Sequence, residues 1–234
     1  MKISKRIDTA KLPKHIAFIM DGNGRWALRR GFAKRWMGHE RGYDKMIAAV
    51  KRCSEIGVPV VSVFGFSTEN WSRPREELDE VFRIVRDNMK KDSDELLRLG
   101  IKVVFMGDET KFPNDLQTEL HSIVEKTKSN TKCIFNLCIN YGGRADIIHA
   151  IKKVKDPAKI TEADFSKLLE SRDLPDPDFV VRTSGEQRVS NFMLWQMAYS
   201  ELYFPKKLWP AIDSKFVDKC VIEYQKRNRR FGKV

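Results

Sequence analysis

Five consecutive residues near the N-terminus combine an acid, two glycines and a guanidinium, in the segment Asp21-Gly-Asn-Gly-Arg25. They leave an apolar run and lead into a helical pattern. Glycines let backbone N–H groups approach an anion, a helix start adds partial positive charge, and arginine binds phosphate through two hydrogen bonds. Asp21 would repel that phosphate unless a divalent cation lay between them, and Mg²⁺ is commonly held by one or two carboxylates plus substrate phosphates. The segment predicts a magnesium–phosphate site, with a simple Asp-Gly turn as the alternative.

A second polar segment follows the apolar run 178–182. Arg182 and Arg188 flank the small residues 183–185, and Ser190 and Asn191 come directly afterwards. We expect Ser190 and Asn191 to open a helix over 190–198, so that guanidiniums, hydroxyls and a helix N-terminus surround one anion. The pattern predicts a second diphosphate site.

Two further polar residues are candidates for the same chemistry. Glu201 offers a second metal carboxylate, although its spacing is equally consistent with a surface acid. His39 follows Gly38 at the expected start of a helix, where an imidazole can donate a hydrogen bond to phosphate. Two phosphate sites and two separated carboxylates predict an enzyme that joins two phosphorylated substrates with the help of a metal.

The elements that must position these residues alternate along the chain. Short apolar runs rich in Val, Ile or Phe predict strands at 15–20, 59–66, 101–107, 132–139 and 178–182. Helical patterns occupy 38–56, 75–99, 113–128, 143–155, 161–170, 190–198 and 214–230. Such alternation predicts a mostly parallel central sheet flanked by helices, in one α/β domain over residues 1–234. The polar segments each follow a strand, so they should meet beyond the carboxyl ends of the sheet, where open α/β folds bind ligands.

The helix expected over 75–99 carries a continuous apolar face. Its members at helical spacing are Leu78, Phe82, Val85, Met89 and Leu96. Core packing is the ordinary explanation for such a face. Beside two phosphate sites, it predicts one wall of a hydrophobic tunnel.

The composition of the chain indicates which binding partners and which cellular location to expect. A formal charge of +12 and a pI near 9.5 predict an anionic partner, whether nucleic acid, anionic lipid or a polyphosphorylated small molecule. No apolar run approaches the roughly 18–20 residues that span a bilayer, and the basic start lacks the apolar stretch of a secretory signal, so we expect a cytoplasmic protein. Four sparse cysteines predict buried thiols rather than disulfides or a zinc site.

A dinucleotide fold is the main competitor for the first loop, because Gly22, Gly24 and Ala27 match G-x-G-x-x-A. That fingerprint requires an acid about 20 residues on, at the end of the next strand. Here the acid after the next strand is Glu69, which lies 48 positions beyond Asp21. The spacing disfavours the dinucleotide interpretation.

Taken together, the motifs resemble those of the cis-prenyltransferases, and most closely the bacterial undecaprenyl diphosphate synthases. The resemblance covers nearly the whole chain in order, through His15 to Ala27, Gly38-His-x-x-Gly42, Phe66 to Pro74, Asn140 to Arg144 and Arg182 to Phe192. It implies an α/β fold with a hydrophobic tunnel, a homodimer, and Mg²⁺-dependent condensation of isopentenyl diphosphate with an allylic diphosphate, usually farnesyl diphosphate. The product would be a long-chain polyprenyl diphosphate, such as the undecaprenyl carrier of cell-wall synthesis.

The resemblance also implies roles for individual residues. Asp21 would handle Mg²⁺ and assist departure of the diphosphate, and Glu201 would complete the metal site from the partner subunit's side. The allylic diphosphate would be bound by Gly22, Asn23, Gly24, Arg25 and Trp26, with Arg35 and His39 nearby. Isopentenyl diphosphate would be bound by Arg182, Arg188, Val189 and Ser190. A substrate-contacting stretch would comprise Ser67, Thr68, Glu69, Trp71 and Arg73.

Asn70 matches a residue assigned to proton removal after the new carbon–carbon bond forms. An amide does not ionise usefully near neutral pH, so we interpret Asn70 as an orienting group that helps a proton reach phosphate or water. Two positions depart from the pattern. Gln187 stands where many relatives have histidine, and Ser184 replaces a common glycine.

Two other functions remain as alternatives to the enzyme. A nucleic-acid-binding module would explain the charge, but no zinc, helix-turn-helix or RNP pattern is present, so we expect no nucleic-acid partner. A catalytically silent subunit would lack the reactive groups, whereas Asp21, Arg25 and Asn70 are retained. For the enzyme, we expect at most peripheral contact with the inner face of the membrane, for product release.

Overall fold

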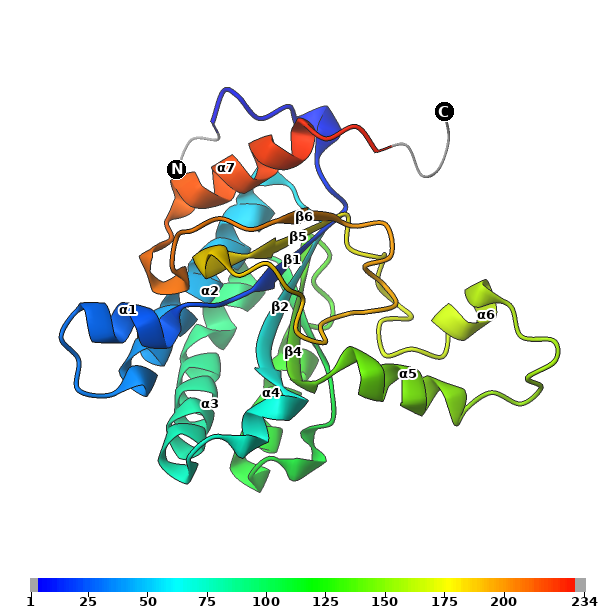
Figure 1. Cartoon of the computed structure of the whole chain (residues 1–234), viewed down its shortest axis with the longest axis horizontal. Helices are drawn as coiled ribbons and strands as arrows, with labels where there is room; N and C mark the ends of the chain where they lie inside the picture. The colour runs from blue at the N-terminus through cyan, green and yellow to red at the C-terminus, as the bar shows by residue number, and fades with distance from the viewer. Residues whose placement is uncertain (1–3, 230–234) are drawn as a thin grey trace.

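The computed structural model describes residues 4–229 (Figure 1). Its centre is one sheet of six strands in the order β3-β4-β2-β1-β5-β6, and every neighbouring pair is parallel. The strands are β1 (His15–Ile19), β2 (Val60–Ser67), β3 (Ile101–Met106), β4 (Cys133–Tyr141), β5 (Phe179–Arg182) and β6 (Glu201–Tyr203). The predicted α/β class with a mostly parallel sheet is confirmed, and so are the five strands expected from the sequence.

In the described part of the chain, seven α-helices connect and cover the strands. They are α1 (Asn23–Arg29), α2 (Gly38–Ile56), α3 (Arg75–Arg98), α4 (Asn114–Thr127), α5 (Gly143–Ile151), α6 (Glu162–Ser166) and α7 (Ser214–Gln225). Helix α2 has the predicted bounds because Gly57 follows it with a φ of 103°, the left-handed conformation that favours glycine after a helix. Figure 1 shows α5 and α6 projecting from the body of the molecule.

The two faces of the sheet have different covers. On one face, Ile16, Phe18 and Val61 pack in a core with side chains of α2, α3, α4 and α7. On the other face, Ala17 and Ile19 pack against Phe192 and Met193, which belong to an irregular segment. All five residues of β1 are buried, as expected for a central strand of a parallel sheet.

A buried polar chain crosses the sheet from β4 to β1. The Asn136 side-chain amide donates to Ser62 Oγ at 2.8 Å, and Ser62 Oγ lies 2.7 Å from His15 Nε2. The other ring nitrogen, Nδ1, lies 2.7 Å from the Pro175 carbonyl oxygen. This arrangement suits a neutral imidazole that donates from Nδ1 and accepts at Nε2, and burial lowers the pKa of His15 to about 4.

The structure differs from expectation in three places. The helix predicted over 190–198 is absent: these residues form turns, and Ser190, Asn191 and Met193 have positive φ values. Strand β6 was not expected, because three residues are too short to show an alternating pattern. Helices α5, α6 and α7 end earlier than predicted, at Ile151, Ser166 and Gln225, and the predicted end of the last helix at residue 230 lies outside the described residues.

Two predictions about whole-chain properties are also tested. All four cysteines are free and buried, as expected for thiols that pack as small apolar groups. Within residues 4–229, none of the helices has the length and apolar character required to cross a membrane.

Candidate functional site

The polar segments meet at the carboxyl ends of β1 and β5, which are neighbours in the sheet. Ile19, the last residue of β1, is in register with Arg182, the last residue of β5, and Asp21 follows two positions after Ile19. β1 has β2 on one side and β5 on the other. The chain leaves β1 towards the β2 side of the sheet and returns to the opposite side only with β5. Such a point of divergence is the usual ligand crevice of an open α/β sheet.

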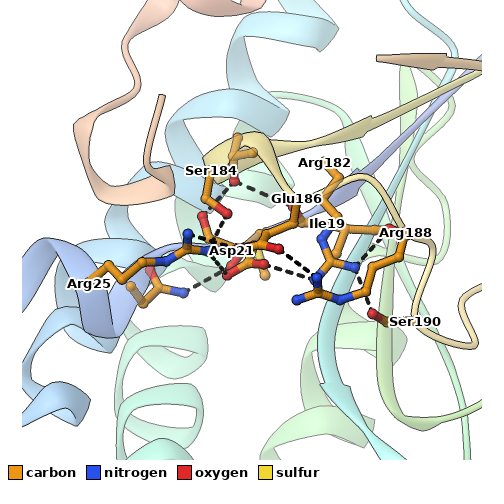
Figure 2. A network of polar contacts seen from close by, with 11 residues as sticks. Ile19, Asp21, Arg25, Arg182, Ser184, Glu186, Arg188 and Ser190 are labelled. Atoms are coloured by element: carbon orange, nitrogen blue, oxygen red, sulfur yellow. Dashed lines mark hydrogen bonds and ion pairs between the residues drawn. The ribbon is translucent and has the colours of Figure 1, made fainter. Parts of the chain in front are cut away.

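Asp21 is the centre of an ion network at this crevice (Figure 2). Its Oδ2 accepts from Arg182 Nη2 at 2.9 Å, and its Oδ1 accepts from Arg25 Nη2 at 3.2 Å. Burial raises the pKa of this carboxyl, but the hydrogen bonds and charges of the two guanidiniums outweigh burial and hold the pKa below its ordinary value. Asp21 is therefore ionised at neutral pH.

The backbone around Asp21 is fixed from two further segments. Thr183 Oγ1 donates to the Asp21 carbonyl oxygen at 2.7 Å, and Trp209 N donates to the same oxygen at 3.1 Å. Gly22 next to it has a φ of 108°, and a Cβ there would lie 2.9 Å from the Leu208 side chain. Only glycine permits this close packing of the loop.

The network extends to the segment after β5. Arg25 donates to Ser184 Oγ at 2.6 Å and pairs with Glu186 at 2.9 Å, and Glu186 pairs in turn with Arg188 at 2.5 Å. The hydrogen bond and charge of Arg188 lower the pKa of Glu186. Figure 2 shows these side chains converging from both sides of Asp21.

Arg182 also organises the loop that carries the second predicted phosphate site. Its Nη1 donates to the Arg188 carbonyl oxygen at 2.7 Å and to Ser190 Oγ at 2.6 Å. The expected helix N-terminus is absent, so its partial positive charge does not contribute to this site. Of the donors predicted for the second diphosphate site, the guanidiniums and hydroxyls are present and the helix N-terminus is not.

A second ion group lies where α2 and α3 begin. Glu77 of α3 accepts from His39 Nε2 at 3.2 Å and from Arg73 Nη1 at 3.1 Å. The hydrogen bond of His39 lowers the pKa of Glu77, burial opposes it, and Arg73 and Arg35 lower it further. Arg35 covers the first loop, because a Cβ at Gly24 would lie 2.9 Å from Arg35 Nε.

Asn70 lies in a 3₁₀ turn after β2. Its Oδ1 accepts from Ser67 N at 3.1 Å, and the two residues form a capping box. An amide oxygen that is already an acceptor in this turn is held in a fixed orientation.

A cavity of about 370 Å³ opens among these groups. Its polar wall includes Asp21, His39, Asn70, Arg73, Arg182 and Arg188. Its remaining wall is mostly apolar and comes from α2, α3, β2, β4 and their neighbours, as in Tyr43, Met46, Phe64, Val81, Phe82, Ile84, Val85, Phe112, Leu116, Leu137 and Ile139. A charged group and an apolar chain of one ligand would therefore both find complementary surface here.

Comparison with known proteins shows the family of the chain. The family model described as "Putative undecaprenyl diphosphate synthase" matches residues 19–232. The chain belongs to this family. The isoprenyl transferase of Fusobacterium nucleatum is 45% identical over 225 residues, covering 95% of this chain and 97% of the relative. That of Clostridium perfringens is 43% identical, covering 95% and 90%. The chain is thus an enzyme that transfers prenyl groups.

Solved structures of the family confirm the fold. Lavandulyl diphosphate synthase from Lavandula x intermedia, solved with dimethylallyl diphosphate, superposes with a TM-score of 0.92 at 32% identity, covering 95% of this chain and 99% of that one. A probable undecaprenyl diphosphate synthase from Campylobacter jejuni gives a TM-score of 0.80 at 30% identity, with 94% and 99% covered. The expected resemblance to the cis-prenyltransferases is confirmed.

Within this family fold, some of the predicted site residues line the cavity, and others, among them Gly22, Gly24, Arg25, Arg35 and Val189, are not among its lining residues. Asp21, Asn23, His39, Ser67, Asn70, Arg73, Arg182, Arg188 and Ser190 line the cavity. Thr68 and Trp71 instead line a smaller pocket beside α5, and Glu69 accepts from Asn191 at 2.8 Å. Trp26 stacks on Phe32 outside the cavity. These four predicted substrate contacts face other surfaces in the structure.

Glu201 lies at the far end of the short strands from Asp21. Its partner in the sheet is Phe179, the first residue of β5, whereas Arg182 beside Asp21 is the last. Three residues of strand correspond to about 10 Å. The prediction that Glu201 and Asp21 hold one metal therefore requires a second copy of the chain. Among residues 4–229, no three Asp, Glu, His or Cys side chains form a metal site by themselves.

Two residues of the site were not predicted from the sequence. Glu77 brings His39 and Arg73 together, and Glu186 joins Arg25 to Arg188. Glu77 stands in an acid-rich first helical turn, which predicts only a favourable interaction with the helix dipole. Glu186 belongs to the family motif, but no local pattern shows that its carboxylate bridges two arginines.

Proposed function

We propose that this enzyme elongates an allylic diphosphate, with farnesyl diphosphate as primer, by adding isopentenyl diphosphate units to give a long-chain polyprenyl diphosphate of the undecaprenyl kind, a carrier lipid of cell-wall synthesis. The observation that carries the proposal is the continuity of one cavity from the Asp21–Arg182 ion pair to an apolar wall. The ionic end suits diphosphates, and the apolar end suits a hydrocarbon chain. In this proposal the cavity is the product tunnel.

The chain's own groups suit the two diphosphates. Arg25 and His39, with Arg35 over the first loop, would bind the allylic diphosphate, and Arg182, Arg188 and Ser190 would bind isopentenyl diphosphate. Fixed guanidinium donors on both sides of the crevice would stabilise the negative charge that develops on the departing diphosphate. Asn70 would orient the group that receives the proton lost after condensation.

Magnesium fits this site with Asp21 as its protein ligand. The carboxylate is ionised, 25% exposed and held in place by two guanidiniums. Mg²⁺ prefers oxygen ligands and accepts one or two carboxylates when substrate phosphates supply the others. Bound there, Mg²⁺ would neutralise diphosphate charge, with Glu201 of a second copy completing the site as the family resemblance implies.

A homodimer is part of the proposal. Exposed apolar side chains lie on the edge strand β6 and on α5, at Leu202, Ile148 and Ile151. Such groups are commonly covered in an assembly. Light scattering of the purified chain should give twice the mass of one chain, and a monomer would leave Glu201 without access to Asp21.

Product analysis tests the proposed function. The purified enzyme is incubated with farnesyl diphosphate, labelled isopentenyl diphosphate and Mg²⁺, and the product chain length is measured. A ladder of products that ends at a long polyprenyl diphosphate is the expected result. The likeness to lavandulyl diphosphate synthase supports a second candidate, condensation of five-carbon units alone. Activity only with dimethylallyl diphosphate, with no long product, would favour that candidate.

A further inference from the structure

Residues 23–37, comprising α1 and the turn that follows it, form an exposed hairpin beside the cavity mouth; we call it the α1 hairpin. Figure 1 shows it at the edge of the molecule, in blue. Three large apolar side chains are exposed on or next to it: Leu28 is 50% exposed, and Phe32 and Met37 are each 38% exposed. Only eight large apolar side chains are exposed in residues 4–229, so this segment concentrates them.

The apolar side chains of the hairpin continue into a groove. Its volume is about 350 Å³, and its apolar wall comprises Trp26, Phe32, Trp36, Met37 and Ile84. Trp26 and Phe32 stack with their ring centroids 5.8 Å apart, which gives the hairpin a fixed aromatic base. Ile84 also lines the central cavity, so this groove and the apolar part of the cavity share a wall.

The polar rim of the groove carries Glu40, Asp44 and Glu80 beside Arg41, whereas the end of α1 carries the cations Arg29 and Arg30. From Arg25 to Arg41 the chain carries six arginines or lysines and one acid. Two of these cations, Arg29 and Arg30, have no acidic partner within residues 4–229, and Arg30 lies over the Trp26 ring at 5.3 Å. An unpaired cation beside an exposed apolar side chain matches an anionic headgroup above a hydrocarbon layer.

We propose that the α1 hairpin docks the enzyme on an anionic lipid bilayer, with Leu28, Phe32 and Met37 entering the headgroup region and Arg29 and Arg30 binding lipid phosphates. The inference rests on the proposed function, because a long polyprenyl chain has no soluble destination. Docking at this hairpin would bring the wall formed by Ile84 next to the bilayer. Nucleic acid fits less well, because the exposed side chains between the cations are aliphatic as well as aromatic.

Vesicle binding of the full chain tests the hairpin, and the chain offers a matched control. Leu28→Ser/Arg29→Glu alters a Leu-Arg pair at the end of α1, and Leu97→Ser/Arg98→Glu alters another at the far end of α3, where Leu97 is 36% exposed. Binding is measured by co-sedimentation with phosphatidylcholine vesicles, with and without about a third phosphatidylglycerol. Phe32→Ser, outside α1, is a second hairpin variant that leaves the helix unchanged.

The wild type and the α3 variant should bind the anionic vesicles at least about tenfold more tightly than the neutral ones, and the hairpin variants should lose about tenfold or more of that binding. Equal binding by all variants, or binding indifferent to phosphatidylglycerol, would overturn the proposal. So would binding to a mixed oligonucleotide but not to vesicles, or a change from dimer to monomer in the hairpin variants, which would make the hairpin a subunit contact. In parallel, condensation of farnesyl diphosphate with isopentenyl diphosphate by the wild type is measured in detergent. A wild type that binds vesicles but catalyses no condensation would count against the proposed function and not against the docking surface.

Discussion

The five charged side chains around the crevice keep one another in place before any substrate arrives. Two carboxylates, Asp21 and Glu186, face three guanidiniums, those of Arg25, Arg182 and Arg188, so the group has one excess positive charge. A diphosphate can take the place of Glu186 on its two arginines at modest cost, because Glu186 is partly exposed and water can solvate the released carboxylate. Asp21 is more buried, and its displacement would cost more.

Replacement of Asp21 separates its charge from its shape. Asp21→Asn keeps the size of the side chain and removes the charge that faces Arg25, Arg182 and the proposed magnesium ion. We expect turnover to fall at least about a hundredfold, the scale for loss of a main electrostatic group, while folding survives. The measurement is kcat at saturating substrates, with circular dichroism as a check of folding.

Glu76→Gln is the matched control for Asp21→Asn. Glu76 is an exposed carboxylate that pairs with Lys34 near the same mouth, and surface ion pairs contribute little. Its turnover should stay within about twofold of the wild type. Equal losses in the two variants would mean that general charge at the mouth, rather than Asp21 itself, supports catalysis.

Gln187 tests whether the departure from histidine matters. Its side chain is exposed, between the network members Glu186 and Arg188. We expect Gln187→Ala to cost about tenfold or less, in line with one or two neutral hydrogen bonds of about 1 kcal/mol each. Kinetics over a magnesium series measure this. A collapse as deep as that of Asp21→Asn would place Gln187 in the metal site.

The converse variant restores the common residue. Gln187→His should stay active and add at most a pH dependence near the ordinary imidazole pKa of about 6.5. Activity profiles from pH 5.5 to 8 on both proteins, about the range in which imidazole titrates, give the comparison.

At the scale of the elements, strong local signals predicted most of the fold. Gly57 follows α2 directly, and β1 is a short run that is apolar apart from His15, so both were found with accurate bounds. The crevice followed from strand order, because each polar segment comes directly after a strand. Glu201 could not be placed in this way, because β6 was not recognised and its register depends on β5.

The segment 190–198 shows why a helical pattern can fail. Phe192 and Met193 are fully buried against the sheet. The apolar residues of this segment therefore serve to cover the sheet and do not form one face of a helix. The backbone at Ser190, Asn191 and Met193 is left-handed, and it is held by tertiary contacts such as Arg182 to Ser190 and Gly143 N to the Asn191 carbonyl oxygen at 2.6 Å. Local sequence contains no signal for contacts between residues so far apart.

Helix α3 gives the test of the tunnel. Its predicted apolar face is buried in part, and Phe82 and Val85 line the cavity. Val85→Trp would fill apolar space there, so we expect shorter products while the first condensations continue. Leu97→Trp, on the exposed side of the same helix, should leave product length unchanged. The product chain lengths of both variants are measured. Identical distributions would mean that α3 contributes to core packing and does not line a product tunnel.

For the whole molecule, stability depends on the polar chain through His15. The folded state holds this imidazole neutral, with its pKa lowered by burial from 6.5 to about 4. Between these pH values the unfolded chain binds the proton more readily, so stability is present above about pH 6.5 and is lost as the pH falls towards 4. The loss reaches roughly 2 kcal/mol between pH 7.5 and pH 5.

Urea unfolding at the two pH values measures this loss. His15→Asn keeps a donor to the Pro175 carbonyl oxygen and cannot titrate, so its unfolding free energy should change about 2 kcal/mol less between pH 7.5 and pH 5 than that of the wild type. If the wild type and the variant show parallel pH profiles, another group dominates the acid sensitivity.

The position of β1 in the sheet has a consequence for synthesis on the ribosome. β1 is made among the first residues, but one of its two neighbours is β5, at residues 179–182, and its second face is covered by Phe192 and Met193. Until those residues emerge, the nascent chain exposes the unpaired edge of a strand that is wholly buried in the folded protein, which is a template for aggregation. Fragments that stop before residue 179 should therefore be insoluble or chaperone-bound, and Asp21 acquires its partner Arg182 only near the end of translation.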